Sequence, residues 1–147
     1  MQGWLASRRL RLVWTALVHI AADAEPVSGK VLSERLNCSR RYLEADLQSL
    51  AQCGLLDSRR GAKGGYLLSR SPQRLSLLDV LQCLGSEKGE SEAPGCPVQQ
   101  QVVMVQLEEV QAAMGELLTG ITLADAVAKA EAAGLLRAPK SSPDFCI

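Results

Sequence analysis

The sequence is poor in aromatic residues and in histidine, and no apolar run is long enough to cross a membrane. Aromatic residues make up only 3% of its 147 residues, although the hydrophobic fraction is 47%. Leucine, valine and alanine must therefore fill the core, which favours a mainly helical fold over a sandwich of strands. The single histidine, His19, excludes a two-histidine metal site, and no P-loop, nucleophile elbow or dinucleotide fingerprint is present. We therefore expect a protein that is not an enzyme.

The formal net charge is zero, but the positive and negative residues are segregated along the chain. Residues 1–74 carry twelve Lys or Arg against six Asp or Glu, a net charge of +6. Residues 75–147 carry four against ten, a net charge of −6. A basic half of this kind is typical of a surface that contacts a polyanion. The alternative is a chance asymmetry of solvated faces.

The five cysteines form neither a small-domain disulfide framework nor a CxxC zinc pair. A reducing cytoplasm is the expected location. Arg8 and Arg9 precede an apolar stretch at 12–22, as in a signal peptide. The helical periodicity of that stretch favours instead a helix of the folded protein.

Hydrophobic periodicity predicts six helices and one β-hairpin. The helices span about residues 8–22, 28–36, 40–53, 76–84, 98–118 and 122–134. Ser28 is the expected N-cap of the second helix, and Ser76 with Asp79 forms a capping box. The strands at 55–59 and 66–69 flank a basic, glycine-rich turn.

The order helix, short helix, tight turn, helix and basic hairpin is that of a winged helix-turn-helix domain. The fold expected is mainly α with a small β-hairpin wing and a long C-terminal dimerisation helix. We divide the chain into a DNA-binding domain (1–84), a flexible loop (85–97), the dimerisation helix with a final short helix (98–134) and a disordered tail (135–147).

A helix fits the major groove, where each base pair shows a distinct pattern of donors and acceptors. The third predicted helix turns Leu43, Leu47 and Leu50 towards the core and leaves a polar face outside. The alternative is that its surface arginines are only solvated. The candidate DNA-binding residues, on this helix, at helix starts and in the hairpin, are Ser28, Ser39, Arg40, Arg41, Tyr42, Glu44, Ala45, Gln48, Arg59, Arg60 and Lys63.

Five apolar residues of the long helix step by four, three, four and three positions. They are Val103, Leu107, Val110, Met114 and Leu117. This is the a/d spacing of a coiled-coil seam, which predicts a homodimer interface. Packing within one subunit is the alternative.

Three runs of the sequence resemble one family of regulators. They are Tyr-Leu-Glu at 42–44, Arg-Gly-Ala-Lys-Gly-Gly-Tyr at 60–66 and Ile-Thr-Leu-Ala-Asp at 121–125. With these runs, residues 10–127 resemble the IscR/NsrR/CymR-type bacterial winged helix-turn-helix transcription regulators. The resemblance implies that Glu44 contacts a base, that Arg60 enters the minor groove and that the long helix crosses to the partner subunit. A two-fold dimer of this kind binds a pseudo-palindromic site.

Many members of that family sense iron–sulfur clusters through three cysteines in the loop before the long helix. Here the loop offers only Cys96, with Glu90 and Gln101 near the other two expected positions and Met104 where a histidine ligand would follow. Because such clusters require thiolates, we expect no cofactor, and a cluster with non-standard ligands is the alternative. Cys96 is instead the candidate for a reactive thiol of a redox sensor. The cysteines in predicted helices are interpreted as small apolar fillers.

One rival function is a winged-helix adaptor that binds proteins and no longer binds DNA. Its recognition helix would have lost its basic residues. Arg40 and Arg41 argue against that reading. The expected partners are therefore double-stranded DNA and a second copy of the chain, with no membrane.

Overall fold

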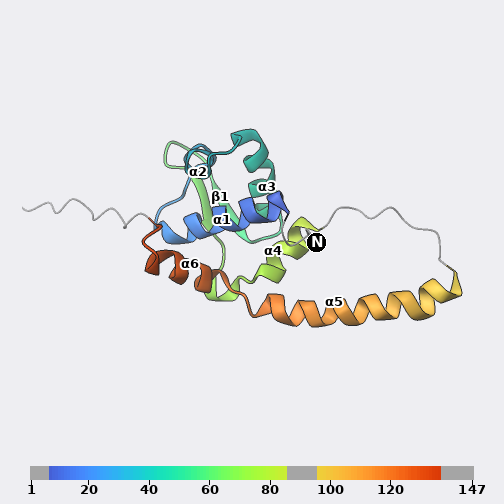
Figure 1. The fold of residues 1–147 in the computed structure, drawn as a ribbon. Coiled ribbons are helices and arrows are strands. Elements are labelled where there is room, and N and C mark those ends of the chain that lie inside the picture. Colours follow the sequence, from blue (N-terminus) through green and yellow to red (C-terminus); the bar gives the residue numbers. More distant parts are fainter. Residues whose placement is uncertain (1–6, 86–95, 137–147) are drawn as a thin grey trace, which may run out of the picture.

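The computed structural model describes residues 7–85 and 96–136. In chain order the elements are α1 (Arg8–Ala22), α2 (Gly29–Leu36), α3 (Arg40–Gln52), β1 (Leu56–Arg59), β2 (Gly65–Leu68), η2 (Pro72–Arg74), α4 (Leu77–Leu84), η3 (Gln99–Val103), α5 (Met104–Thr119) and α6 (Leu123–Ala132) (Figure 1). The strands β1 and β2 form an antiparallel hairpin in which Leu56 lies opposite Leu68 and Arg59 opposite Gly65. The predicted mainly helical fold with one hairpin is confirmed.

Hydroxyl side chains define the starts of four helices. In each case the oxygen accepts a hydrogen bond from a backbone N–H of the first turn, which satisfies one of the donors left free at a helix start. The four residues are Ser7, Ser28, Ser76 and Thr122. The predicted cap at Ser28 and the predicted capping box of Ser76 with Asp79 are both confirmed.

The core is built around α1, which packs against α2, α3, α4, α6 and β2. Val13, Ala16 and Leu17 on α1 are completely buried. The buried face of α3 meets them with the leucines expected from the sequence, Leu43, Leu47 and Leu50. Aliphatic side chains make up nearly all of this core, as the scarcity of aromatic residues predicts.

The root of the hairpin is tied to the segment before α2. Tyr66 N–H donates to the Val27 carbonyl at 2.8 Å, and Val27 N–H donates to the Tyr66 carbonyl at 3.1 Å. Gly65 has φ of +149°, and a Cβ built there would lie 2.5 Å from the Val27 carbonyl carbon. Only glycine allows this approach, so Gly65 permits the close contact across which the Val27 and Tyr66 hydrogen bonds form.

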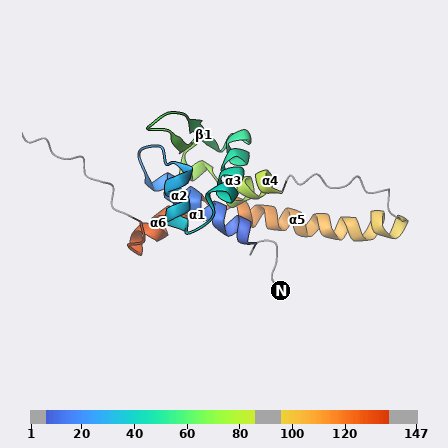
Figure 2. The same ribbon diagram turned by 90° about the horizontal axis from the view of Figure 1, so that it is seen from above.

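The C-terminal helices differ in their packing. Helix α5 extends away from the other helices, as Figures 1 and 2 both show, whereas α6 returns to pack against α1. Leu123 at the start of α6 is completely buried, and its N–H donates to the Leu75 carbonyl at 2.8 Å. The final helix, which we grouped with the dimerisation helix, therefore shares the core of the helices in residues 8–84.

The long helix itself begins with the π-helical stretch η3 and continues to Thr119. Most of the predicted loop, residues 86–95, lies outside the described residues, as does the predicted tail from residue 137 onward. The flexibility expected of both segments and the proposed domain boundaries stay predictions.

A disulfide joins Cys53, at the C-terminal cap of α3, to Cys83 in α4. The interpretation of Cys53 as a small apolar filler was wrong, because Cys53 is exposed. Cys83 packs against the core as expected, but its sulfur is also bonded to that of Cys53. The partners stand thirty residues apart in sequence, and only the packing of α4 on α3 brings their Cα atoms to 6.1 Å. Cysteine spacing alone cannot reveal such a pair.

Candidate nucleic-acid interface

Helix α3 presents one polar face to solvent. Because an α-helix has 3.6 residues per turn, the buried leucines at 43, 47 and 50 turn the opposite face outward. Arg41, Ala45 and Gln48 lie on that face and are exposed. Two of them carry hydrogen-bond donors and the third is small, so the face can approach base edges closely.

The candidates at the start of α3 flank this face. Arg40 is exposed, and Tyr42 is 53% exposed. Ser39 is the N-cap residue and is exposed, but its side chain makes no capping hydrogen bond. Ser28 differs, because its hydroxyl caps α2 by accepting from Val31 N–H at 3.2 Å.

The Glu44 carboxylate is held between two neighbours. Arg40 Nε donates to Glu44 Oε1 at 3.0 Å, and the Glu44 side chain is 34% exposed. On the other side it lies against Gly29, where an added Cβ would come within 2.7 Å of Oε1. Burial raises the pKa of the nearby Tyr66 hydroxyl, and the charge of Glu44 raises it further, while Arg40 opposes both effects. Arg40 and Gly29 thus restrict where the carboxylate points.

The hairpin carries three exposed cationic side chains, Arg59, Arg60 and Lys63. Its tip turns at Gly61, which has φ of +109° and accepts a hydrogen bond from Gly64 N–H at 2.9 Å. In Figure 1 the hairpin, α2 and α3 lie on one side of α1, and α5 and α6 lie on the other. The structure therefore places α3 and the hairpin, the two elements that carry most of the candidate residues, on the same side of α1.

Sequence reasoning missed one residue that supports this surface. Asp46 lies on the inner side of α3, is 5% exposed and forms an ion pair with Arg9 of α1. The available signal was a carboxylate placed among the leucines of a helix's apolar face, where a charge requires a partner. The pair links α3 to α1, the central helix of the core.

The predicted seam of α5 is largely uncovered in the single chain. Leu107, Val110 and Leu117 are 62%, 56% and 72% exposed. Val103 is also exposed, and Met114 is half-buried. Exposed apolar rows of this size are typical of surfaces that a partner covers.

Cys96 is exposed and its thiol is free. Within residues 7–85 and 96–136, no three Cys, His, Asp or Glu side chains come together as a metal site would require. The sequence between 86 and 95 adds glutamates but no cysteine. This donor set does not fit an iron–sulfur cluster, which needs several thiolates, and we derive no role for one.

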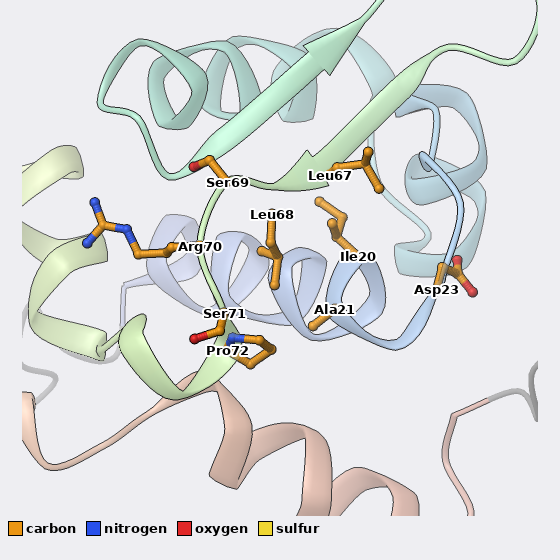
Figure 3. Close-up of a pocket in the computed structure, with 9 residues that line it drawn as sticks. All are labelled: Ile20, Ala21, Asp23, Leu67, Leu68, Ser69, Arg70, Ser71 and Pro72. Atoms are coloured by element: carbon orange, nitrogen blue, oxygen red, sulfur yellow. The ribbon is translucent and has the colours of Figure 1, made fainter.

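A hollow of about 400 Å³ lies between the end of α1 and the segment from β2 to η2. In Figure 3 the charged side chains at its rim, Asp23 and Arg70, point away from each other. Asp23 is already engaged, because Arg35 Nη1 donates to its Oδ2 at 2.7 Å. The hollow therefore presents no pair of charges that would bind a small ligand.

The fold and this surface define a winged helix-turn-helix regulator that binds DNA. Residues 6–129 match the Rrf2 family model, described as an iron-dependent transcriptional regulator. The chain therefore belongs to the Rrf2 family of transcription regulators.

Individual relatives agree with this assignment. The chain is 32% identical over 133 residues to the HTH-type transcriptional regulator ORF2 of Azotobacter vinelandii, covering 86% of this chain and 81% of that one. Among solved structures it is similar to T. potens IscR, with TM-score 0.64, 30% identity and coverage of 90% and 92%. It is also similar to Bacillus subtilis CymR, with TM-score 0.64, 26% identity and coverage of 84% and 95%.

Several other curated relatives are matched over only part of their length. The chain spans 42% of one of them and 49% of two others. In the part of the chain that the structure describes, no helix is both long and apolar enough to cross a membrane.

Proposed function

We propose that this chain regulates transcription as a homodimer that binds a pseudo-palindromic DNA site. In each subunit α3 enters the major groove and the hairpin wing contacts the adjacent minor groove. The observation that carries the proposal is the exposed polar face of α3 together with an exposed cationic hairpin that lies, like α3, on one side of α1. Because the function is exerted through binding, we assign the chain no catalytic activity, and we place it in the cytoplasm with its DNA.

Base recognition is assigned to the exposed face of α3. An arginine such as Arg41 can donate two hydrogen bonds to guanine, and a glutamine such as Gln48 can pair with adenine. Ala45 between them is small enough to contact a thymine methyl group. Glu44 accepts from a cytosine amino group, with its carboxylate oriented by Arg40 and Gly29.

Backbone contacts are assigned to the residues around that face. Ser39 and the first N–H groups of α3 bind a phosphate, and the Tyr42 hydroxyl reaches the same strand. In the wing, Arg60 enters the minor groove, where a narrow groove strengthens the negative potential. Arg59 and Lys63 contact phosphates, which contributes affinity but little sequence preference.

Dimerisation is assigned to the exposed apolar seam of α5. Two copies that pair along Leu107, Val110 and Leu117 cover side chains that are otherwise more than half exposed. A two-fold axis then presents two α3 helices to half-sites about one DNA turn, roughly 34 Å, apart. The site is therefore expected to be a pseudo-palindrome.

The proposal is tested by selecting binding sites from random-sequence DNA with the full chain. We expect a pseudo-palindromic site protected over both half-sites, with two chains bound per duplex. Arg41→Ala should lose preference at one base pair in each half-site. Arg74→Ala, which removes an exposed arginine of η2, is the matched control and should keep the selected sequence. Binding of one chain per site, or no enriched sequence, would overturn the proposal.

A further inference from the structure

We propose that Cys53 and Cys83 form a reversible dithiol–disulfide switch that sets the DNA affinity of the recognition helix. The inference rests on the proposed DNA-binding function and concerns its regulation. Cys53 is the residue at which α3 ends, and Cys83 lies in the last turn of α4. The bond between them therefore joins the recognition helix directly to a second helix.

The two positions suit a bond that forms and breaks. Their Cα atoms are 6.1 Å apart, within the range of about 4.4–6.8 Å that a disulfide spans. Cys53 is exposed, so a dissolved thiol or disulfide can reach its sulfur. Cys83 is half-buried and its Sγ lies 3.4 Å from the Ser49 carbonyl oxygen. Once reduced, the Cys83 thiol can donate to that oxygen, so the reduced state also has a polar partner.

The place of the bond in the fold connects it to DNA binding. The disulfide closes a loop that contains both strands of the wing and η2. Helix α4 packs against α3 on one side and against α5 on the other. In the oxidised chain the end of α3 is therefore covalently fixed to α4, which packs against α5, the helix that carries the proposed dimer seam. In the reduced chain this covalent link is absent, and packing and the contacts of Arg9 with Asp46 and the Leu84 carbonyl remain.

The oxidised form exposes the polar face of α3 to solvent. Arg41, Ala45 and Gln48 are exposed while the bond is in place. Fixing α3 before binding lowers the entropy lost when the dimer aligns two helices on one site. We therefore expect oxidation to strengthen binding to the specific site and to leave non-specific phosphate binding by the wing unchanged.

The oxidant is a low-molecular-weight disulfide such as oxidised glutathione. The Cys53 thiolate attacks one sulfur of the oxidant, which forms a mixed disulfide and releases one small thiolate. The Cys83 thiolate then attacks the Cys53 sulfur and displaces the second small thiolate. Two electrons pass to the oxidant, and the two protons of the protein thiols end on the two released thiols. Reduction by excess small thiol reverses both steps.

The test equilibrates the full chain in glutathione buffers of graded ratio. One sample is alkylated and analysed by mass spectrometry, which counts the free thiols. A second sample is titrated into a DNA duplex that was selected with the oxidised protein. We expect Cys53 and Cys83 to lose their thiols together, and the oxidised form to bind about five- to tenfold more tightly than the reduced form. Cys53→Ser and Cys83→Ser should each keep the reduced affinity in every buffer. Cys38→Ser, which removes a free thiol that takes no part in the disulfide, is the matched control and should respond like the wild type.

Two results would overturn the switch. One is a pair of thiols that alkylate in every buffer, and the other is equal or tighter binding by the reduced form. If neither form binds any selected DNA, the proposed function fails with it. The thiol count shows separately whether the pair titrates.

Discussion

Arg9 Nε donates a hydrogen bond to Asp46 Oδ1 at 2.7 Å and so joins the start of α1 to the inner side of the recognition helix. The Asp46 side chain is 7% exposed and that of Arg9 is 34% exposed. Arg9 Nη1 also donates to the Leu84 carbonyl at 3.4 Å, at the end of α4. One guanidinium therefore contacts α3 and α4, the two helices that the disulfide also connects.

Removing the Asp46 carboxylate should destabilise the fold. In Asp46→Ala the charged hydrogen bond between Arg9 and the buried carboxylate is lost, which costs about 1–3 kcal/mol of unfolding free energy. Urea denaturation of the full chain measures this difference. Asp57→Ala removes an exposed carboxylate of β1 and serves as the control, with a change of roughly 0.5 kcal/mol or less. Equal stability of the two variants would show that the ion pair contributes nothing.

Substituting Arg60 and substituting Lys63 should affect different kinds of DNA binding. Arg60→Ala is expected to weaken binding to the specific site by about 1–3 kcal/mol, because it removes the proposed minor-groove contact. Lys63→Ala should lower affinity equally on all sequences and make the dependence on salt shallower, because it removes the proposed phosphate contact. Titrations at several salt concentrations, on selected and scrambled duplexes, separate the two effects. Unchanged affinity in both variants would remove the wing from the mechanism.

A charge in the seam of α5 should separate the subunits. Val110→Glu places a carboxylate in the proposed interface, where burying it without a partner is costly. We expect the dimer dissociation constant to rise by about tenfold or more, as measured by sedimentation. Val105→Glu makes the same change on the opposite face of α5, at a side chain that is 45% exposed, and should leave the dimer intact. Equal dissociation by both variants would contradict the seam.

His19 should make stability depend on pH. Burial lowers the pKa of its imidazole below the ordinary value of 6.5, and Arg35 lowers it further, while Asp23 opposes the shift. As pH falls below 6.5, the unfolded chain therefore binds a proton that the folded chain does not yet hold, so stability decreases. Melting temperatures between about pH 8 and pH 5 should fall more steeply for the wild type than for His19→Gln. Parallel curves would show that His19 does not contribute.

Iron content distinguishes a thiol-based regulator from a cluster sensor. Because Cys96 is the single thiol near the start of α5, protein purified without oxygen should hold no stoichiometric iron and show no visible absorbance bands. Iron and sulfide assays with an absorbance spectrum check this. Stoichiometric iron that is lost in Cys96→Ala would establish a cluster with unusual ligands.

Local sequence patterns were enough to predict the α-helices and the hairpin of this fold, but not η2 or the π-helical stretch η3. Caps such as Ser28 and Ser76 and apolar positions such as Leu43 and Leu47 act within one or two turns, so their effect is visible in the sequence itself. The polar face of α3 followed from the same periodicity. The family runs at 42–44 and 60–66 added the expected roles of single residues.

The relations between distant segments were decided only by the tertiary structure. The ion pair of Arg9 with Asp46 and the disulfide of Cys53 with Cys83 join residues 37 and 30 positions apart. Neither pair is encoded in a local period, because each depends on how α1 and α4 cross α3. The packing of α6 on α1 is likewise a contact that the local sequence does not reveal. A short amphipathic helix shows that it has an apolar face, but not which other helix that face contacts. The sequence by itself thus determined which segments are helices and which face of each is apolar, and the three-dimensional packing decided which of those faces and side chains meet.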